Sequence, residues 1–327
     1  MARVFIDGFE SGGLDLWDTI GGEAAVNSSL SGRDGNYCLN CYGSASAYKY
    51  LMKAIPSKSE LYVAFLFNPG NSGRIFSFYN SGTKLGYISL SSISVGNIQA
   101  YKGPSTLLAT GTAMITGSTW YLIEIHYIPA TSGGVFQVKV NGISDISYSG
   151  NTTPGATTID GIMVGCDDSY WPPGYYDNVI VDDAAWIGNT KIQAIKPTSA
   201  GNSTQWGPSS GSNWDCVNEM PANDNDYVST NSNDFLDLYT FSDLTGSIEE
   251  IKCVQVQART VKNGAPTPQN LQLAVRSGGT NYFSSSNVVP YVNPKSLFNI
   301  WQLNPNTSAA WTVSEVNAAE FGMNAVA

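Results

Sequence analysis

The sequence predicts an all-β protein of two domains, each a β-sandwich. Short runs of alternating apolar and polar residues recur along the chain, separated by turn residues and with almost no helical periodicity. Charged residues make up only 13%, whereas the 327 residues include 33 glycines and 18 tyrosines, a mixture typical of strands joined by tight turns. A third observation is a matched pair of strand-like segments, residues 5–12 and 175–182, which carry carboxylates beside small residues.

The strands predicted between these two segments follow one another at short intervals. The clearest is 120–127, in which Tyr121, Ile123 and Ile125 would share one face. Residues 135–140 alternate between apolar and polar side chains and end at Asn141-Gly142, which predicts a tight hairpin turn. Because no crossover helices intervene, the series indicates an antiparallel sandwich. Further strands are predicted at 61–67, 74–79, 85–90 and 159–165.

The matched segments 5–12 and 175–182 set the predicted domain boundaries. If they pair in space, residues 1–188 form one closed sandwich. A connector would cover 189–200, and a second β-sandwich would cover 201–327, with one short helix between 313 and 320.

The order of the motifs resembles that of a known fold family. An initial F-I-D-G-F-E-S-G, a central W-Y-L-I-E-I-H-Y, a G-V-F-Q-V-K-V-N-G hairpin, an I-D-G-I-M-V-G strand and a closing Y-Y-D-N-V-I-V-D resemble concanavalin A-like, laminin-G-type jelly rolls. The resemblance covers about residues 1–188 and implies two curved antiparallel sheets packed face to face. Residues 195–327 resemble the C-terminal halves of tailed-bacteriophage virion proteins, through T-Q-W-G-P-S-S-G-S-N-W-D-C-V-N-E and the final W-T-V-S-E-V-N-A-A-E-F-G.

Charge and composition exclude several classes of function. Sixteen basic and 26 acidic residues give a formal net charge of −10, so we expect no binding to nucleic acid. No stretch has the length of a membrane span, so no membrane insertion is expected. The first residues lack the apolar core of a signal peptide, so we expect the chain to be made in a cytoplasm. The low charge is typical of proteins that end up outside cells, and a virion component satisfies both expectations.

A calcium ion is the one cofactor that the jelly-roll resemblance implies. In jelly rolls of this type a pair such as Glu10 and Asp177, helped by oxygens near Asp7, often holds one Ca²⁺ that ties the ends of the sandwich. Carboxylate and carbonyl oxygens are the ligands that calcium takes. Such an ion would be structural. The alternative is that no ion is present, that Glu10 caps a turn and that Asp177 begins an Asx-turn.

The remaining carboxylates and the cysteines receive plain structural interpretations. The neighbouring pairs Asp167-Asp168 and Asp182-Asp183 are expected to be solvated, with a metal site as the alternative. Cys38-Leu39-Asn40-Cys41 has no second ligand pair beyond it, so the five cysteines are expected to be small buried hydrophobic residues rather than zinc ligands.

The pattern predicts no enzyme. Glycoside hydrolysis needs two carboxylates facing each other in a cleft, and residues 1–188 contain no closely spaced glutamate pair. The single histidine, His126, lies in the middle of a predicted strand, and the chain has no Gly-x-Ser-x-Gly motif. We therefore expect no catalytic residues.

An aromatic loop offers a binding site instead. Tyr170 and Trp171 stand before two prolines that would stiffen the loop, and Tyr175 follows. Flat aromatic side chains suit sugar rings, so these three residues are candidate glycan-binding residues. The alternative is an aromatic loop that folds over the end of the sandwich or is buried against a neighbouring subunit.

Together these inferences predict a non-enzymatic structural protein of a tailed-phage virion, either tail- or fibre-associated or a capsid decoration protein. Its partners would be other virion proteins and copies of itself in a homo-oligomer, and it would be located in the virion after assembly in the host cytoplasm. The alternative function is a host-adhesion module that binds a cell-surface glycan.

Overall fold

The computed structural model describes residues 3–30, 34–43, 48–167, 173–262, 264, 270–290 and 293–327. The chain forms two compact units. Unit 1 comprises Met1–Glu10 and Trp17–Ile192, and unit 2 comprises Ser11–Leu16 and Gln193–Ala327. No helix within the described ranges is long and apolar enough to cross a lipid bilayer.

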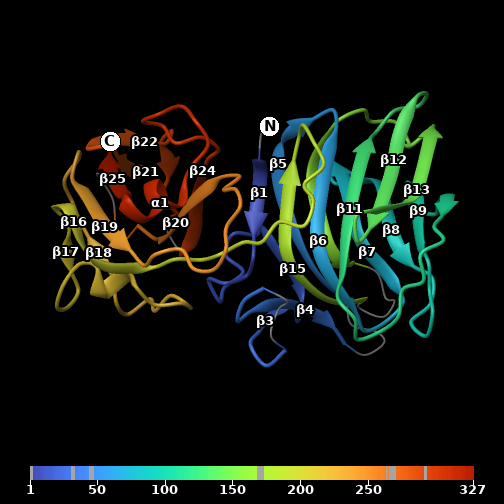
Figure 1. Cartoon of the computed structure of the whole chain (residues 1–327), viewed down its shortest axis with the longest axis horizontal. Coiled ribbons are helices and arrows are strands. Elements are labelled where there is room, and N and C mark those ends of the chain that lie inside the picture. The colour runs from blue at the N-terminus through green and yellow to red at the C-terminus, as the bar shows by residue number, and fades with distance from the viewer. Residues whose placement is uncertain are drawn as a thin grey trace. The chain divides into compact units, whose positions relative to one another are not determined.

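Unit 1 is a sandwich of two antiparallel sheets (Figure 1). The first sheet, as far as the chain is described, has eight strands; seven of them lie in the order β13 (Ile143–Gly150), β12 (Gly134–Val140), β11 (Tyr121–Ile128), β6 (Leu61–Pro69), β15 (Pro173–Asp182), β4 (Cys38–Tyr42) and β3 (Ala25–Asn27), and β1 (Arg3–Asp7) pairs with β15. The described part of the second sheet has seven strands in the order β10 (Thr106–Thr110), β9 (Ile98–Lys102), β8 (Thr83–Leu90), β7 (Gly73–Asn80), β14 (Ile159–Cys166), β5 (Lys49–Lys58) and β2 (Thr19–Gly22).

The core of unit 1 lies between these sheets and is rich in aromatic rings. Phe78 of β7 stacks on Tyr127 of β11 with ring centroids 4.5 Å apart, and Phe76 lies 5.5 Å from Phe65 of β6. These contacts join the two sheets, because the alternation of side chains along a strand sends every second residue inward. The all-β class, with a jelly-roll sandwich in unit 1, is thereby confirmed.

The two ends of unit 1 pair as the sequence predicts. β1 runs antiparallel to β15, with Phe5 opposite Val181 and Asp7 opposite Val179. The hairpin predicted at Asn141-Gly142 joins β12 to β13, and both residues have positive φ angles of 51° and 80°. Asparagine and glycine tolerate this conformation, and it matches the twist of the flanking strands.

Unit 2 is built on one larger antiparallel sheet. Among its described residues this sheet contains β16 (Pro197–Thr204), β19 (Leu236–Phe241), β25 (Glu320–Val326), β21 (Asn270–Ser277) and β22 (Thr280–Phe283) in that order, with β23 (Asn287–Val288) beside β21. Smaller pairs are β20 (Val254–Thr260) with β24 (Lys295–Trp301), and β17 (Gly207–Pro208) with β18 (Val228–Ser229); the helices are the 3-10 turn η1 (Asp215–Val217) and α1 (Val313–Ala318).

The core of unit 2 joins the larger sheet to the β20–β24 pair and to α1. It includes Leu273 of β21, Phe321 of β25, Val256 of β20, Trp301 of β24 and Val316 of α1. Helix α1 begins with a capping box, in which the side chains of Thr312 and Glu315 each bind the backbone N–H of the other. The short helix predicted near residues 313–320 is therefore present.

Candidate functional site

The outer face of the seven-stranded sheet of unit 1 carries a cluster of aromatic and charged side chains. In β7, Phe76 and Phe78 point into the core, so Ser77 and Tyr79 point to the other side. The strand register then places Ser77 opposite Tyr87 of β8, and Tyr87 opposite Tyr101 of β9. We call this cluster the tyrosine face; it consists of Tyr50, Arg74, Tyr79, Lys84, Tyr87, Tyr101 and Asp167.

Asp167, the residue directly after β14, lies at the polar centre of the tyrosine face. Its carboxylate accepts hydrogen bonds from Tyr79 Oη at 2.8 Å and from Lys84 Nζ at 2.9 Å, and it pairs with Arg74 Nη1. Burial by itself would raise the pKa of Asp167, but the hydrogen bonds and charges of Lys84, Tyr79 and Arg74 outweigh burial and lower it. Asp167 is therefore ionised at neutral pH. Burial, followed by the charge of Asp167, raises the pKa of Tyr79 far above its usual value, so the phenol stays protonated.

Aromatic rings hold the two cations of the tyrosine face in place. The Arg74 guanidinium lies over the Tyr87 ring, 4.4 Å from its centroid, and Tyr87 stacks on Tyr101 at 4.7 Å with an interplanar angle of 5°. Lys84 Nζ lies 5.7 Å from the Tyr79 ring and 5.9 Å from the Tyr87 ring. Cations placed over aromatic faces are attracted to them electrostatically.

Two small residues, Gly21 and Ser77, lie next to tyrosines of this face. Tyr50 of β5 lies over Gly21 of β2, where a Cβ atom would stand 2.2 Å from its ring, so any larger residue at position 21 would displace the Tyr50 side chain. Ser77, between Met163 and Tyr87 in the register, is fully buried, and its hydroxyl has no hydrogen-bond partner among the described residues.

The residues predicted to bind calcium are only partly brought together. Both oxygens of Asp7 are engaged, because Oδ1 accepts from the Phe9 backbone N–H at 2.7 Å and Oδ2 from Trp17 Nε1 at 2.8 Å. Glu10 accepts from the backbone N–H groups of Asn36 and Tyr37. Within the described ranges no three His, Cys, Asp or Glu side chains gather as a metal site requires.

Asp177 is the member of this set that lacks ordinary partners. It is 1% exposed, its Oδ1 accepts from the Asn178 backbone N–H at 2.7 Å, and no hydrogen bond from the described residues reaches its Oδ2. Burial raises the pKa of Asp177 to about 7; the N–H groups of Asn178 and Asp34 oppose that rise, and the charges of Glu10 and Asp34 reinforce it. The unpartnered Oδ2 of Asp177 fits a cation, for which Glu10 and backbone oxygens would be further ligands, and the calcium site stays a prediction.

The calcium prediction is tested by thermal unfolding of the full chain. If Ca²⁺ binds the folded state but not the unfolded state, the unfolding midpoint will be higher in Ca²⁺ than in EDTA. At a Ca²⁺ concentration a hundredfold above the dissociation constant, the free energy of unfolding should rise by about 2.7 kcal/mol. Mg²⁺ at the same concentration is the control, because it demands an octahedral oxygen cage and should not reproduce the shift. Equal unfolding midpoints in Ca²⁺ and EDTA would contradict the calcium prediction.

Of the three predicted glycan-binding residues, only Tyr175 lies among the described residues, and it is not part of the tyrosine face. Tyr170 and Trp171 lie outside the described residues. Tyr175 of β15 belongs to the other sheet, where its ring lies 5.8 Å from that of Tyr42, which is 41% exposed. The exposed Tyr42 and the half-buried Tyr175 thus form a separate aromatic platform.

Two carboxylates that the sequence assigned to solvent form ion pairs with cations from other strands. Asp182 is fully buried and binds Arg3 Nη1 at 3.1 Å, while Asp167 joins the tyrosine face. The expectation of a solvated carboxylate is wrong for Asp182, which is buried against Arg3, whereas Asp167 remains exposed and is also ion-paired. The alternation within 74–79 and 85–90 indicates which side chains of each strand share a face. The pairing of the two strands, which the sequence does not show, brings the residues of the tyrosine face together.

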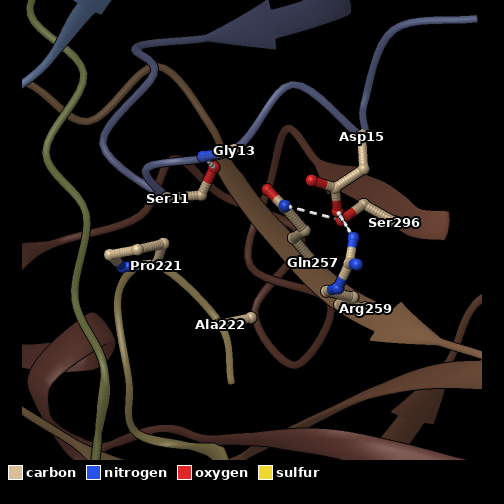
Figure 2. A pocket seen from close by; sticks show the side chains of 8 residues that line it. All are labelled: Ser11, Gly13, Asp15, Pro221, Ala222, Gln257, Arg259 and Ser296. Atoms are coloured by element: carbon tan, nitrogen blue, oxygen red, sulfur yellow. Dashed lines mark hydrogen bonds and ion pairs between the residues drawn. The ribbon is translucent and has the colours of Figure 1, made fainter. Parts of the chain in front are cut away.

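Among the described residues, unit 2 contains two cavities, and the charged groups that line the first satisfy one another. The first, of about 200 Å³, is shown in Figure 2. Arg259 Nη1 pairs there with Asp15 at 3.1 Å, and its Nε and Nη2 bind Asp224, while Ser296 donates to Asp15. Hydrogen bonding to Asp224 raises the pKa of Arg259, which marks a stabilised ion network. The second cavity, of about 240 Å³, includes Asn304 and Glu315 of the helix cap in its lining.

Comparisons with known proteins find likeness in fold alone. No protein-family model matches the sequence, and no curated protein matches it. Domain 4 of AbnA, a GH43 extracellular arabinanase from Geobacillus stearothermophilus in complex with arabinotriose, is 16% identical, with a TM-score of 0.40, over 57% of this chain and 94% of that one. Alginate lyase Aly36B is 15% identical, with a TM-score of 0.37, over 52% of this chain and 88% of its own. The metal-free carbohydrate recognition domain of Emp46p is 9% identical, with a TM-score of 0.37, over 52% and 89%. Likeness at this level assigns no function.

Proposed function

We propose that unit 1 is a glycan-binding module and that the tyrosine face is its binding surface. The observation that carries the proposal is the stack of Arg74, Tyr87 and Tyr101 beside the hydrogen-bonded centre of Tyr79, Lys84 and Asp167. Binding sites for small ligands combine aromatic surface with a few placed polar groups, and tyrosine supplies both. A sugar ring offers the matching chemistry, an apolar ring face edged by hydroxyl groups.

The protonation states on the tyrosine face favour binding over cleavage. A glycosidase needs a carboxylic acid whose pKa is raised so that it can donate a proton. Asp167 has a lowered pKa and is held as a carboxylate by three donors, and Tyr79 has a raised pKa and stays a neutral hydroxyl. Both groups are therefore suited to hold a ligand by hydrogen bonds, and we propose no catalytic step.

A glycan array with two single variants tests the proposal. Replacing Tyr101 by Ala removes one ring of the stack and should weaken binding about two- to twelvefold, since an aromatic contact of this kind contributes about 0.5–1.5 kcal/mol beyond its area. Tyr175→Ala is the matched control, because it removes a half-buried tyrosine of the other sheet. If only Tyr175→Ala abolishes binding, the site is the platform of Tyr42 and Tyr175; if the unaltered chain binds no glycan, the proposed function is wrong.

The virion role predicted from the sequence remains a separate proposal. Its support is the resemblance of residues 195–327 to C-terminal halves of tailed-phage virion proteins, and it is compatible with glycan binding by unit 1. A cryo-EM map of purified phage particles tests it directly, since density for multiple copies of this chain is expected on the tail or the capsid. Particles that lack the chain would exclude the structural role.

A further inference from the structure

We infer that the second cavity of unit 2 binds a neutral, hydroxyl-bearing ligand of the size of one sugar ring. The cavity, of about 240 Å³, lies among the end of β21, the loop after β24 and helix α1. Ordinary pockets for drug-sized ligands hold about 300–1,000 Å³, so the ligand expected here is smaller. Because the tyrosine face belongs to unit 1, this inference does not rest on the proposed function.

The buried amide of Asn304 carries the inference. Asn304 is 1% exposed, its backbone N–H donates to the oxygen of Ala309 at 2.9 Å, and its backbone oxygen accepts from the Ser308 N–H at 2.8 Å. Its Oδ1 accepts from the Asn306 N–H at 3.0 Å, which fixes the orientation of the amide group. Among the described residues Nδ2 has no hydrogen-bond acceptor, although Asn304 lines the cavity. A ligand that accepts this bond would relieve the cost of a buried, unsatisfied donor.

Glu315 supplies an acceptor beside this donor. Its Oε2 accepts from the backbone N–H and the hydroxyl of Thr312, at 2.8 and 2.9 Å. These hydrogen bonds lower the pKa of Glu315, and the side chains of Asn304 and Thr307 lower it further, so Glu315 is a carboxylate at neutral pH. Asn304 thus lies near Glu315, but no hydrogen bond of ordinary geometry joins Nδ2 to it. A ligand atom that bonds to both groups would complete the pattern.

A donor beside an acceptor selects a hydroxyl group as the ligand atom. Among the described residues that line the cavity none is cationic, so Glu315 would repel an anion. An ammonium group has only donors and would leave Asn304 unsatisfied, and a trans peptide group points its N–H and its C=O in opposite directions. A hydroxyl group accepts from Asn304 and donates to Glu315 at once. Ser277 and Ser314, also in the lining, provide hydroxyl groups for a second contact.

Small residues keep the cavity open. Ala318 and Ala319 line it without long side chains, and Gly278 lies at its edge with a φ angle of 57°. A Cβ atom at Gly278 would stand 2.3 Å from Asn306 Nδ2 and would displace that amide. The Asn306 side chain is held by Tyr282, whose hydroxyl donates to Oδ1 at 3.1 Å. Apolar walls with a few fixed polar groups suit a sugar ring, and their preorganisation lowers the cost of binding.

Methyl NMR of the full chain with ¹³C-labelled alanine tests the inference, because Ala318 and Ala319 line the cavity. The probes are the methyl glycosides of galactose, glucose and mannose. We expect at least one of them to shift both alanine signals, with a dissociation constant in the millimolar range that suits so small a ligand. If none shifts either signal, the inference is wrong. That result would leave the proposed function intact, because its test reads Tyr101 of unit 1.

Three further probes define the class of ligand. Galacturonate adds a negative charge to a sugar ring, methylammonium offers only donors, and N-methylacetamide represents a peptide group. We expect each to bind at least tenfold more weakly than the best neutral glycoside. An equal affinity for galacturonate or methylammonium would contradict a neutral ligand, and tighter binding of N-methylacetamide would assign the cavity to a peptide instead.

Two variants of helix α1 locate the site. Ala318 is exposed, so Ala318→Leu should fill the cavity and weaken binding at least tenfold, read at Ala319. Val313→Leu is the matched control, because it enlarges a residue of the same helix outside the lining.

Glu315→Gln tests the acceptor directly. Glutamine also completes a capping box, so the helix should remain, but its amide group replaces the carboxylate. We expect binding to weaken about tenfold, since hydrogen bonds to charged groups are the stronger ones. Unfolding midpoints show whether each variant is folded. Unchanged affinity in Glu315→Gln or in Ala318→Leu would overturn the inference, and the probe comparisons with the unaltered chain decide it even if a variant fails to fold.

Discussion

Replacing Arg3 by Met is expected to destabilise unit 1 by about 3–5 kcal/mol, the usual cost of removing one partner from a buried ion pair. Arg3 Nη1 lies 3.1 Å from Asp182 Oδ2, and the two side chains are 4% and 0% exposed. Without Arg3, the Asp182 carboxylate would remain buried next to strand β1, and its hydrogen-bond donors among the described residues would be the backbone N–H groups of Ala184 and Ala185. Since these residues join the first strand of unit 1 to its last, the loss should loosen the closure of the sandwich.

The measurement is thermal unfolding of the full chain, with hydrogen exchange at β1 and β15 to show where the loss occurs. The double variant Arg3→Met, Asp182→Leu should recover most of the stability, because two apolar side chains replace the whole pair. Lys252→Met is the control: its pair with Glu250 is largely exposed, so the change should stay below about 1 kcal/mol. A loss in Arg3→Met no larger than in this control would show that the buried pair does not close the sheet.

Asp177→Asn is expected to stabilise the chain at alkaline pH when EDTA is present. The pKa of Asp177 is about 7 in the folded chain and 3.8 ordinarily, so between these values the folded state holds the proton more tightly than the unfolded state. Stability from this group is therefore present below pH 3.8 and is lost as the pH rises towards 7. At about 1.4 kcal/mol per pKa unit, removing the charge should add about 2–4 kcal/mol at pH 8 and little at pH 4.

Urea unfolding of the variant and the unaltered chain at the two pH values checks this prediction. Repeating the measurement in Ca²⁺ connects it with the predicted ion, since loss of a ligand would then make Asp177→Asn destabilising. Glu60→Gln is a suitable control, because the Glu60 side chain is 38% exposed and its replacement removes no buried carboxylate. If Asp177→Asn does not raise the free energy of unfolding at pH 8 in EDTA, the buried Asp177 carboxylate does not destabilise the folded chain and the prediction is wrong.

The chain's local pattern was sufficient to predict its class and much of its strand content. The hairpin at Asn141-Gly142 follows from turn chemistry alone, because few residues tolerate positive φ angles. The inward set of β11, with Ile123, Ile125 and Tyr127 fully buried, follows from strict alternation. The pairing of the first and last strands of unit 1 was predicted from two segments of similar composition, residues 5–12 and 175–182.

The candidate site was much harder to predict. Tyr50, Arg74, Lys84, Tyr101 and Asp167 come from different strands or strand ends, and no local motif connects them. Carboxylates were particularly misleading, since a sequence shows that an aspartate is present but not which donor reaches it. Asp7 illustrates this, because its Oδ2 accepts from the Trp17 indole rather than being free for a cation.

The sequence by itself determined an all-β chain, the alternation of inward and outward side chains, and the tight turns between strands, because these depend on near neighbours. Only the tertiary structure decided that Arg74, Lys84 and Tyr79 converge on Asp167, that Arg3 meets Asp182, and that Ser11–Leu16 belongs to unit 2. The reason is that strand register brings together residues up to 179 positions apart, and register is set by the packing of the whole core.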